Sequence, residues 1–360
     1  MNRNQIVAVT ALAFFLLVAL LTVIFAPWLW SLAGVRALQS LGGWLTLPMR
    51  IVTFLGDNLF YLTVMPLVYW CIHKGLGADL LALLVLSKLP YSVVKSFLKV
   101  GRPFWHDASL RLDGAAVGFS TPSGHAQTSA ALFGYLAWFL AGRRRRVLWI
   151  VVWGLLIILV ALSRVYLGVH YPGDVLWGIA MGLALVALYT WLKPVLLPRL
   201  KQLSLGIHVL LALIVAALVP AVEVLLLGIP LGSSRTFGAL YAEAWGTALD
   251  EAVTIGGMVF GLWVGLAIES RYVRFTVAGP LWKRALRYVI GFAGLLAVYM
   301  GLRALFPEEP LWLGLALQSV RYGLAALWII LVWPWLSVKI GLTACESQRE
   351  SRRGLWTMGL

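Results

Sequence analysis

The chain has 360 residues, of which 61% are hydrophobic and only 12% are charged, and its formal net charge is +15. Soluble globular domains are about one quarter charged, so this composition excludes a soluble domain and indicates a polytopic helical membrane protein. The positive charge does not indicate nucleic-acid binding. Most basic residues lie between apolar runs, where they orient a membrane protein and contact anionic lipid headgroups. The two cysteines, Cys71 and Cys345, form neither a metal motif nor a disulfide framework.

Apolar runs of about 20 residues, long enough to cross a bilayer as helices, occur at about ten positions. The runs are 6–32, 52–73, 76–100, 123–142, 147–163, 173–193, 205–229, 250–269, 286–305 and 312–340. We interpret the first as an uncleaved helix, because "LAGVRA" after it is a poor cleavage site. The expected fold is therefore all-α, a membrane bundle of about ten transmembrane helices. Pro194 and Pro198 mark a break, which divides the chain into 1–200, 201–345 and a tail at 346–360.

Basic residues concentrate in alternate loops, which predicts the orientation of the chain. The run from Arg143 to Arg146 is the strongest signal, and the positive-inside rule makes its side cytoplasmic. We expect a protein of the inner membrane with both termini in the cytoplasm. The same side carries Arg3, Lys74, Lys193, Arg199, Lys201, Arg271, Arg274, Lys283, Arg284, Arg287, Arg349, Arg352 and Arg353.

Three polar stretches fall at helix ends on the opposite side, and the first is "KSFLKVGRP". Lys95 and Arg102 are seven residues apart, which places them on one helix face about 10 Å apart along the axis. Two cations on one face can bind an anion. The alternative is that they are interfacial residues whose charged ends reach toward water.

The second stretch, "STPSGHAQ", has the features of a helix start. We expect Thr121 as the N-cap and Pro122 as the first helical residue. The N–H groups of Ser123, Gly124 and His125 would then be unpaired, an arrangement that binds phosphate. His125 is either part of that site or a hydrogen-bonded interfacial histidine.

The third stretch, "SRVYLGVHYPGD", contains Arg164, His170 and Asp174. Asp174 lies in the first turn of a helix that Pro172 opens, where a carboxylate stabilises the helix start. The alternative function is to accept a hydrogen bond from His170 Nδ1, which leaves Nε2 as a nucleophile.

Together these residues predict a phosphoryl-transfer site. Lys95, Arg102, Arg164 and the helix start at Ser123 and Gly124 would surround a phosphoryl group. His170 would attack phosphorus and His125 would protonate the leaving oxygen. We expect no metal and no other cofactor, because no carboxylate cluster offers a magnesium site.

These stretches resemble the signature of the type 2 phosphatidic acid phosphatase superfamily. The family pattern is K-x6-RP, then PSGH, then SR-x5-H-x3-D, and every position is present here in order and at the family spacing. The resemblance covers roughly residues 50 to 195. It implies that His170 is the nucleophile, that His125 is the acid and base, and that six helices form a catalytic core. The region after about residue 200 departs from the short bacterial enzymes of the family, and its apolar runs predict about four further helices. Lys99 falls outside the pattern, and we interpret it as interfacial.

Several functions remain open at this stage. A site at the outer membrane face suits a lipid substrate such as a polyprenyl diphosphate, phosphatidic acid, phosphatidylglycerol phosphate or a lipid A phosphate. A phosphotransferase would use the same phosphohistidine, and the chain length is similar to that of glucose-6-phosphatase, which acts on a soluble sugar phosphate. A lipid transporter and a vanadium haloperoxidase are less consistent with the intact motifs and the many spans. The sequence does not determine the oligomeric state.

The second half contains ionisable residues at or within spans, namely Glu223, Asp250, Glu251, Arg303 and Arg321. A pair of Glu223 with Arg303 or Arg321 is one expectation, and a contact with lipid headgroups is the other. The loop 269–287 combines basic and aromatic residues, which favours contact with anionic lipids.

Overall fold

The structure is a computed structural model that describes residues 3–112, 116–141, 145–229 and 236–345. Within these ranges helix is the only regular secondary structure, and the single extended pairing is an isolated bridge between Phe275 and Cys345. The expectation of an all-α fold is therefore confirmed. The predicted tail at 346–360 lies outside the described residues.

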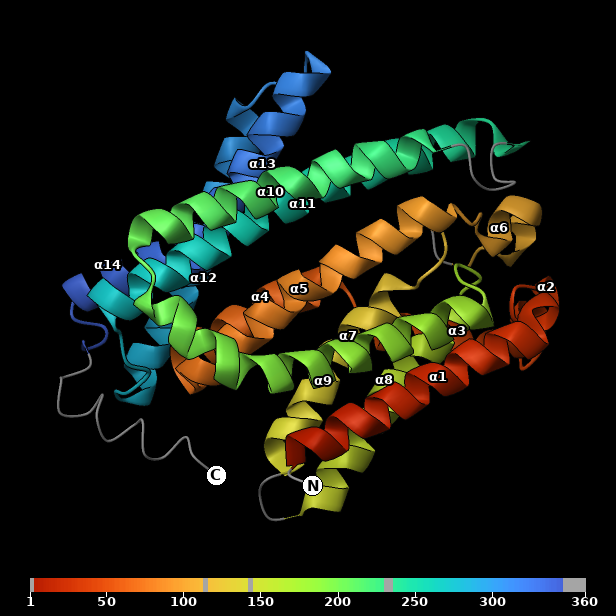
Figure 1. The fold of residues 1–360 in the computed structure, drawn as a ribbon, viewed down its shortest axis with the longest axis horizontal. Coiled ribbons are helices and arrows are strands. Elements are labelled where there is room, and N and C mark those ends of the chain that lie inside the picture. Colours follow the sequence, from red (N-terminus) through yellow and green to blue (C-terminus); the bar gives the residue numbers. More distant parts are fainter. Residues whose placement is uncertain (1–2, 113–115, 142–144, 230–235, 346–360) are drawn as a thin grey trace. The chain divides into compact units, whose positions relative to one another are not determined.

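Figure 1 shows the helices in chain order. They are α1 (Arg3–Leu29), α2 (Leu32–Gln39), α3 (Thr46–Phe54), α4 (Asn58–Leu67), α5 (Lys74–Leu98), α6 (Pro103–His106), α7 (Gly124–Ala141), α8 (Arg146–Tyr166), α9 (Pro172–Gln202), α10 (Leu205–Gly228), α11 (Ala239–Ile268), α12 (Leu281–Leu305), α13 (Leu311–Leu327) and α14 (Trp333–Lys339). Helix α9 runs through both prolines, and the predicted break follows at Leu203 and Ser204.

Eight helices in the described part of the chain are long and apolar enough to cross a membrane. The number rises to nine when the pair 43–54 and 58–72, bent by 44°, is counted as one span. The predicted number was about ten. The difference is α7, whose first turns carry the polar residues His125, Gln127, Thr128 and Ser129.

The chain forms two compact units, and each draws on segments from both sides of residue 200. Unit 1 comprises Met1–Tyr61, Leu86–Arg199 and Ala221–Glu251, and unit 2 comprises Leu62–Val85, Leu200–Pro220 and Ala252–Leu360. The division into 1–200 and 201–345 thus stays a prediction about chain order. All the predicted site residues belong to unit 1.

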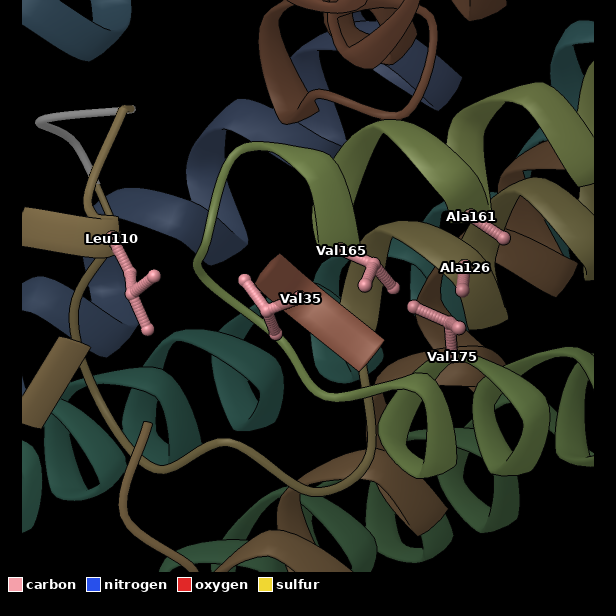
Figure 2. Close-up of a cluster of buried hydrophobic side chains, with 6 residues drawn as sticks. All are labelled: Val35, Leu110, Ala126, Ala161, Val165 and Val175. Carbon is pink, nitrogen blue, oxygen red and sulfur yellow. The ribbon is translucent and has the colours of Figure 1, made fainter. Parts of the chain in front are cut away.

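The core of unit 1 brings the helices of the predicted site together. Figure 2 shows one of its clusters, in which small and β-branched side chains from α2, α7, α8 and α9 meet. Two glycines of α9 allow a close approach to α7. A Cβ on Gly178 would lie 2.7 Å from the Ser123 carbonyl oxygen, and one on Gly182 would lie 2.4 Å from that of Gln127. This packing holds the start of α7 against the start of α9. The cluster in Figure 2 consists of Val35, Leu110, Ala126, Ala161, Val165 and Val175.

Unit 2 is organised around the buried guanidinium group of Arg287. It donates to the backbone carbonyls of Trp70 (2.6 Å), Ala278 (3.1 Å) and Leu342 (2.9 Å), and so joins three segments. The expectation that the basic residues of 269–287 contact lipid is therefore wrong for Arg287. Its N–H groups donate to backbone carbonyls instead of lipid headgroups, because a buried charge needs hydrogen-bond partners.

Candidate phosphoryl-transfer site

His170 lies in the connection between α8 and α9 and is almost fully buried, and each of its ring nitrogens lies near a charged side chain. Nδ1 lies 3.3 Å from Asp174 Oδ2, and Nε2 lies 3.3 Å from Arg102 Nη1. An arginine can only donate, so Nε2 must accept, and the ring proton therefore resides on Nδ1. This arrangement leaves an unprotonated Nε2 beside a cation, as the sequence predicted.

The environment of His170 keeps its ring neutral. Burial, followed by the charge of Arg102, lowers the pKa of His170 to about 3, although the hydrogen bond to Asp174 acts in the opposite direction. A neutral imidazole retains the lone pair that a nucleophile needs.

Asp174 is completely buried in the first turn of α9 and accepts hydrogen bonds at both oxygens. Oδ1 accepts from Trp30 Nε1 (2.9 Å) and from the Thr121 hydroxyl. Oδ2 accepts from the backbone N–H of Tyr171 (2.8 Å), from the Ser120 hydroxyl and from His170. These donors stabilise the ionised carboxylate and fix its direction toward the imidazole.

Two of the predicted cations, Arg102 and Arg164, are held by hydrogen bonds to the polypeptide. Arg102 donates to the carbonyl oxygens of Gly118 (2.7 Å), Val169 (2.9 Å) and Val117. Arg164 donates from Nη1 to Thr53 Oγ1 at 2.7 Å. Both side chains are only 4% exposed. For Lys95 and Arg102, at 3% and 4% exposed, this burial excludes the alternative of interfacial residues that reach water.

Lys95 is 3% exposed and lies on the same side of α5 as Tyr91. Its ammonium group donates to the Tyr91 hydroxyl and lies 4.3 Å from the centre of the Tyr91 ring. It also lies 3.9 Å from the position that a Cβ on Gly118 would occupy, next to the carbonyl that anchors Arg102. The structure thus brings Lys95 to the same loop as Arg102.

The interpretation of Lys99 as interfacial is wrong. Lys99 is fully buried, and its ammonium group donates to the carbonyl oxygens of Leu226 (2.9 Å), Leu227 (3.1 Å) and Ile229. Those carbonyls end α10 and have no partners within that helix, so a buried cation satisfies them.

The expected ion pair of Glu223 with Arg303 or Arg321 is also replaced by another contact. Its carboxylate accepts from Ser92 Oγ (2.8 Å) and from Ser96 Oγ, both on α5. Arg321 lies over the rings of Tyr299 and Tyr322. The sequence offered no signal for either choice of partner.

The start of α7 differs from its prediction by two residues. The helix begins at Gly124, so Ser123 is the residue before it, and the hydroxyl of Thr121 binds Asp174 where an N-cap was expected. The backbone N–H of Ser123 donates to the Asp174 carbonyl at 3.0 Å, so this group is not available to a ligand. The N–H groups of Gly124, His125 and Ala126 open the helix without partners inside it. The Ser123 hydroxyl is buried and has no hydrogen-bond partner in the described part of the chain.

His125 lies in the first turn of α7 and is about one quarter exposed. Its Nε2 lies 3.9 Å from Oδ2 of Asp57, a half-exposed residue between α3 and α4. Sequence analysis missed Asp57, as it missed Trp30, Ser120 and Tyr91, because each comes from outside the three motifs or has an ordinary local role.

Comparison with known proteins identifies the family. Residues 76–197 match the PAP2 superfamily, and residues 253–347 match the transmembrane extension of PAP2 superfamily phosphatases. The chain is 31% identical over 156 residues to phosphatidylglycerophosphatase B of Bacillus subtilis, covering 39% of this chain and 72% of that protein.

Two further relatives are longer than the part they share with this chain. Sphingosine-1-phosphate phosphatase 2 of Mus musculus is 31% identical over 145 residues, 39% of this chain and 40% of that protein. Glucose-6-phosphatase 3 of Bos taurus is 29% identical over 234 residues, 59% of this chain and 66% of that protein. The apolar helices, the motif geometry and these matches show that the chain is a multi-pass membrane protein of the PAP2 superfamily of phosphatases, and that residues 253–347 form the transmembrane extension of that family.

Proposed function

We propose that this protein hydrolyses a lipid phosphate or diphosphate through a phosphohistidine at His170, at the extracytoplasmic face of the inner membrane. One observation carries the proposal. His170 is buried with Nδ1 directed at Asp174 and with Nε2 unprotonated beside Arg102. This is the arrangement of an activated histidine nucleophile.

The first step forms a bond between His170 Nε2 and phosphorus and breaks the bond between phosphorus and the leaving oxygen. The incoming phosphoryl group would replace Nε2 as the partner of Arg102 and would also receive hydrogen bonds from Lys95, Arg164 and the start of α7. These donors balance the charge on the phosphoryl oxygens. Asp174 balances the positive charge that the imidazole gains.

His125 would supply the proton that the leaving oxygen needs, and Asp57 at 3.9 Å would orient its ring. In the second step a water molecule attacks phosphorus, His125 takes a proton from that water, and inorganic phosphate leaves His170. In this scheme Lys95, Arg102 and Arg164 provide the charge that a metal ion provides elsewhere. Among the described residues, no group of three or more His, Cys, Asp or Glu could hold a metal ion.

A half-open apolar cavity of about 660 Å³ in unit 1 favours a substrate with a hydrocarbon tail. Trp30 and Thr121 line it and also bind Asp174, so the cavity begins directly behind the predicted nucleophile. Trp177 bonds to Thr22 in its wall and joins α9 to α1. The names of two relatives, a phosphatidylglycerophosphatase and a sphingosine-1-phosphate phosphatase, agree with a lipid substrate. The other lining residues are Val94, Leu98, Lys99, Val100, Gly101, His106, Tyr171 and Phe237.

The orientation follows from the two ends of α7. Its first turn carries His125, and it ends at Ala141, just before the arginine run, about 27 Å away at the rise of an α-helix. Arg145 and Arg146 are exposed. If the arginine run is cytoplasmic and contacts anionic lipids, as the positive-inside rule favours, the site would lie on the outer face and both termini in the cytoplasm.

A sugar phosphate is the second candidate, and the length of one match favours it. The similarity to glucose-6-phosphatase 3 extends over 234 residues, well beyond the 122 residues of the PAP2 match at 76–197. Transfer of the phosphoryl group to an acceptor lipid would use the same phosphohistidine.

Release of inorganic phosphate by detergent-purified protein in the presence of EDTA tests these alternatives. The substrates are undecaprenyl diphosphate, phosphatidic acid, phosphatidylglycerol phosphate and glucose 6-phosphate, each beside the His170→Ala variant. Release from a lipid that is lost in the variant, with ³²P trapped on the protein in acid-quenched samples, is the expected result. Release from glucose 6-phosphate alone would favour the sugar phosphatase. A fully active His170→Ala variant would disprove the mechanism.

A further inference from the structure

Tyr91 contacts two parts of the predicted phosphate site, Lys95 and the start of α7, although it belongs to none of the three motifs. It lies one helical turn before Lys95 on α5, is 7% exposed, and accepts a hydrogen bond from the Lys95 ammonium group. Its ring also packs on the start of α7. A Cβ on Gly124 would lie 2.8 Å from Tyr91 Cε2, so only glycine fits there.

The hydroxyl group of Tyr91 has a second partner, Glu251 of α11. It donates to Glu251 Oε1 at 3.4 Å, which connects the carboxylate through the tyrosine to Lys95. Glu251 lies in the gap between the two family matches, after 76–197 and before 253–347. A segment outside both matches therefore contacts the phosphate-binding motif.

Other described residues of 221–229 and 236–251 contact the same part of unit 1. Glu223 accepts hydrogen bonds from Ser92 and Ser96, and the carbonyls at the end of α10 accept from Lys99. Leu227, Ala244 and Ala248 pack on Phe119, the residue next to Ser120, which binds Asp174. The segment thus contacts α5 and the loop that carries the carboxylate's donors.

We infer that Tyr91 and Glu251 are positioning residues for Lys95, and that this segment between the family matches completes the phosphate site. The inference rests on the proposed function. An ammonium group has three donors on a freely rotating end. Because the Tyr91 hydroxyl accepts one of them and the ring lies on one side of the ammonium group, the other two are left for a phosphoryl group. Glu251 in turn fixes the rotation of the hydroxyl.

The experiment compares Tyr91→Phe, which keeps the ring and removes the hydroxyl, with substitutions of Glu251. Binding of orthovanadate is measured alongside kcat/KM for the best substrate. For Tyr91→Phe we expect kcat/KM to fall by about tenfold and the vanadate inhibition constant to rise by a similar factor, as for loss of one hydrogen bond to a charged group. Glu251→Ala should act similarly. Glu251→Gln, which keeps an acceptor, should stay within about threefold of the parent protein.

Two controls separate positioning from a general structural role. Glu243 is an exposed carboxylate on the same helix, so Glu243→Ala and Glu243→Gln should leave both quantities unchanged. In a Lys95→Met background, Tyr91→Phe should have almost no further effect on vanadate binding, because the two residues act as one unit.

Three results would overturn the inference. The first is that Tyr91→Phe keeps vanadate binding and kcat/KM within twofold of the parent protein. The second is that Tyr91→Phe weakens vanadate binding by the same factor with and without Lys95. The third is that a Glu243 variant loses as much vanadate binding and kcat/KM as Glu251→Ala does. If His170→Ala is inactive in the same experiment, the proposed function survives any of these. If His170→Ala is active, both fail.

Discussion

Replacement of Asp174 by Asn is the most informative single change, because it alters charge and tautomer without altering size. In the native protein five groups donate to the carboxylate, and two of them can only donate. These are Trp30 Nε1 at 2.9 Å, which faces Oδ1, and the Tyr171 N–H at 2.8 Å, which faces Oδ2. An asparagine has one accepting atom and one donating group, so one of these two donors loses its acceptor at position 174. Trp30 Nε1 would keep the Thr121 hydroxyl oxygen at 3.1 Å, whereas the Tyr171 N–H would be left unsatisfied.

The orientation of the new amide determines what His170 loses. If the NH₂ group takes the Oδ2 position, Nδ1 must accept, the proton moves to Nε2 and the nucleophilic lone pair disappears. If it takes the Oδ1 position, the tautomer is kept but the charge that balances the imidazolium is gone. We expect kcat to fall by about 10³- to 10⁴-fold, as in catalytic triads with the same change. The unsatisfied buried donor should lower the unfolding free energy by about 1–3 kcal/mol.

The assay is phosphate release at saturating substrate together with thermal unfolding in detergent. Trp30→Phe is the matched control, since it removes one donor to Asp174 and keeps the negative charge. This variant should lose about tenfold or less in kcat, the effect of a single hydrogen bond. A kcat for Asp174→Asn within tenfold of the parent protein would show that neither the tautomer nor the charge of this pair matters.

Four further results are expected. His125→Asn should lose about 10²- to 10⁴-fold in kcat on a lipid substrate but far less on p-nitrophenyl phosphate, whose leaving group needs no proton; equal losses would remove it from the acid role. Ser123→Ala should leave the unliganded protein as stable or more stable, because its buried hydroxyl has no partner, and should weaken vanadate binding; destabilisation of the unliganded protein would contradict this. Val94→Trp, which fills the apolar cavity, should lower kcat/KM for a long-chain lipid more than for a short-chain one, and equal effects would exclude the cavity as the tail site. Because the folded-state pKa of His170 is about 3 and its ordinary value is 6.5, the unfolded chain takes up the proton first as the pH falls; the melting temperature should drop between pH 6.5 and pH 4, and the drop should be smaller in His170→Gln.

Most of the fold was accessible from the sequence because each helix of a membrane protein has to be apolar along its whole length. The predicted runs correspond to helices of the structure, and errors occur where that rule is weak. Helix α7 begins with several polar residues because it contributes to the site, and the run at 52–73 became a bent pair. Neither the two compact units nor the docking of 221–251 left a local pattern, since both depend on contacts between distant segments.

The site was predictable in its motif residues and not in their supports. The prediction that Lys95 and Arg102 share one helix face is wrong, because α5 ends at Leu98, the chain leaves the helical conformation at Lys99 (φ +50°), and Arg102 lies directly before α6. The contact of His170 with Asp174, in contrast, follows from a separation of four residues at a helix start. Trp30 could not be found, because a tryptophan near a helix end has a sufficient explanation as an interfacial residue. Lys99 was misassigned for the related reason that a lysine in a membrane helix is assumed to reach water, whereas here the carbonyls ending α10 satisfy it.

The balance of charge in the site favours an anionic ligand over a purely structural function. Lys95, Arg102 and Arg164 are each at most 4% exposed, and Asp174, the carboxylate among the motif residues, already accepts five hydrogen bonds. Burial of three cations is unfavourable unless groups nearby compensate it, and backbone carbonyls and the Thr53 hydroxyl do so only in part. The first N–H groups of α7 add further donors, and the unpartnered Ser123 hydroxyl can donate as well. A phosphoryl group supplies oxygen acceptors and negative charge, so it would compensate both the buried cations and the unpartnered donors. In the proposed function, the same excess of donors that lowers the stability of the unliganded protein would give the site its affinity for a phosphoryl group and for the more highly charged transition state.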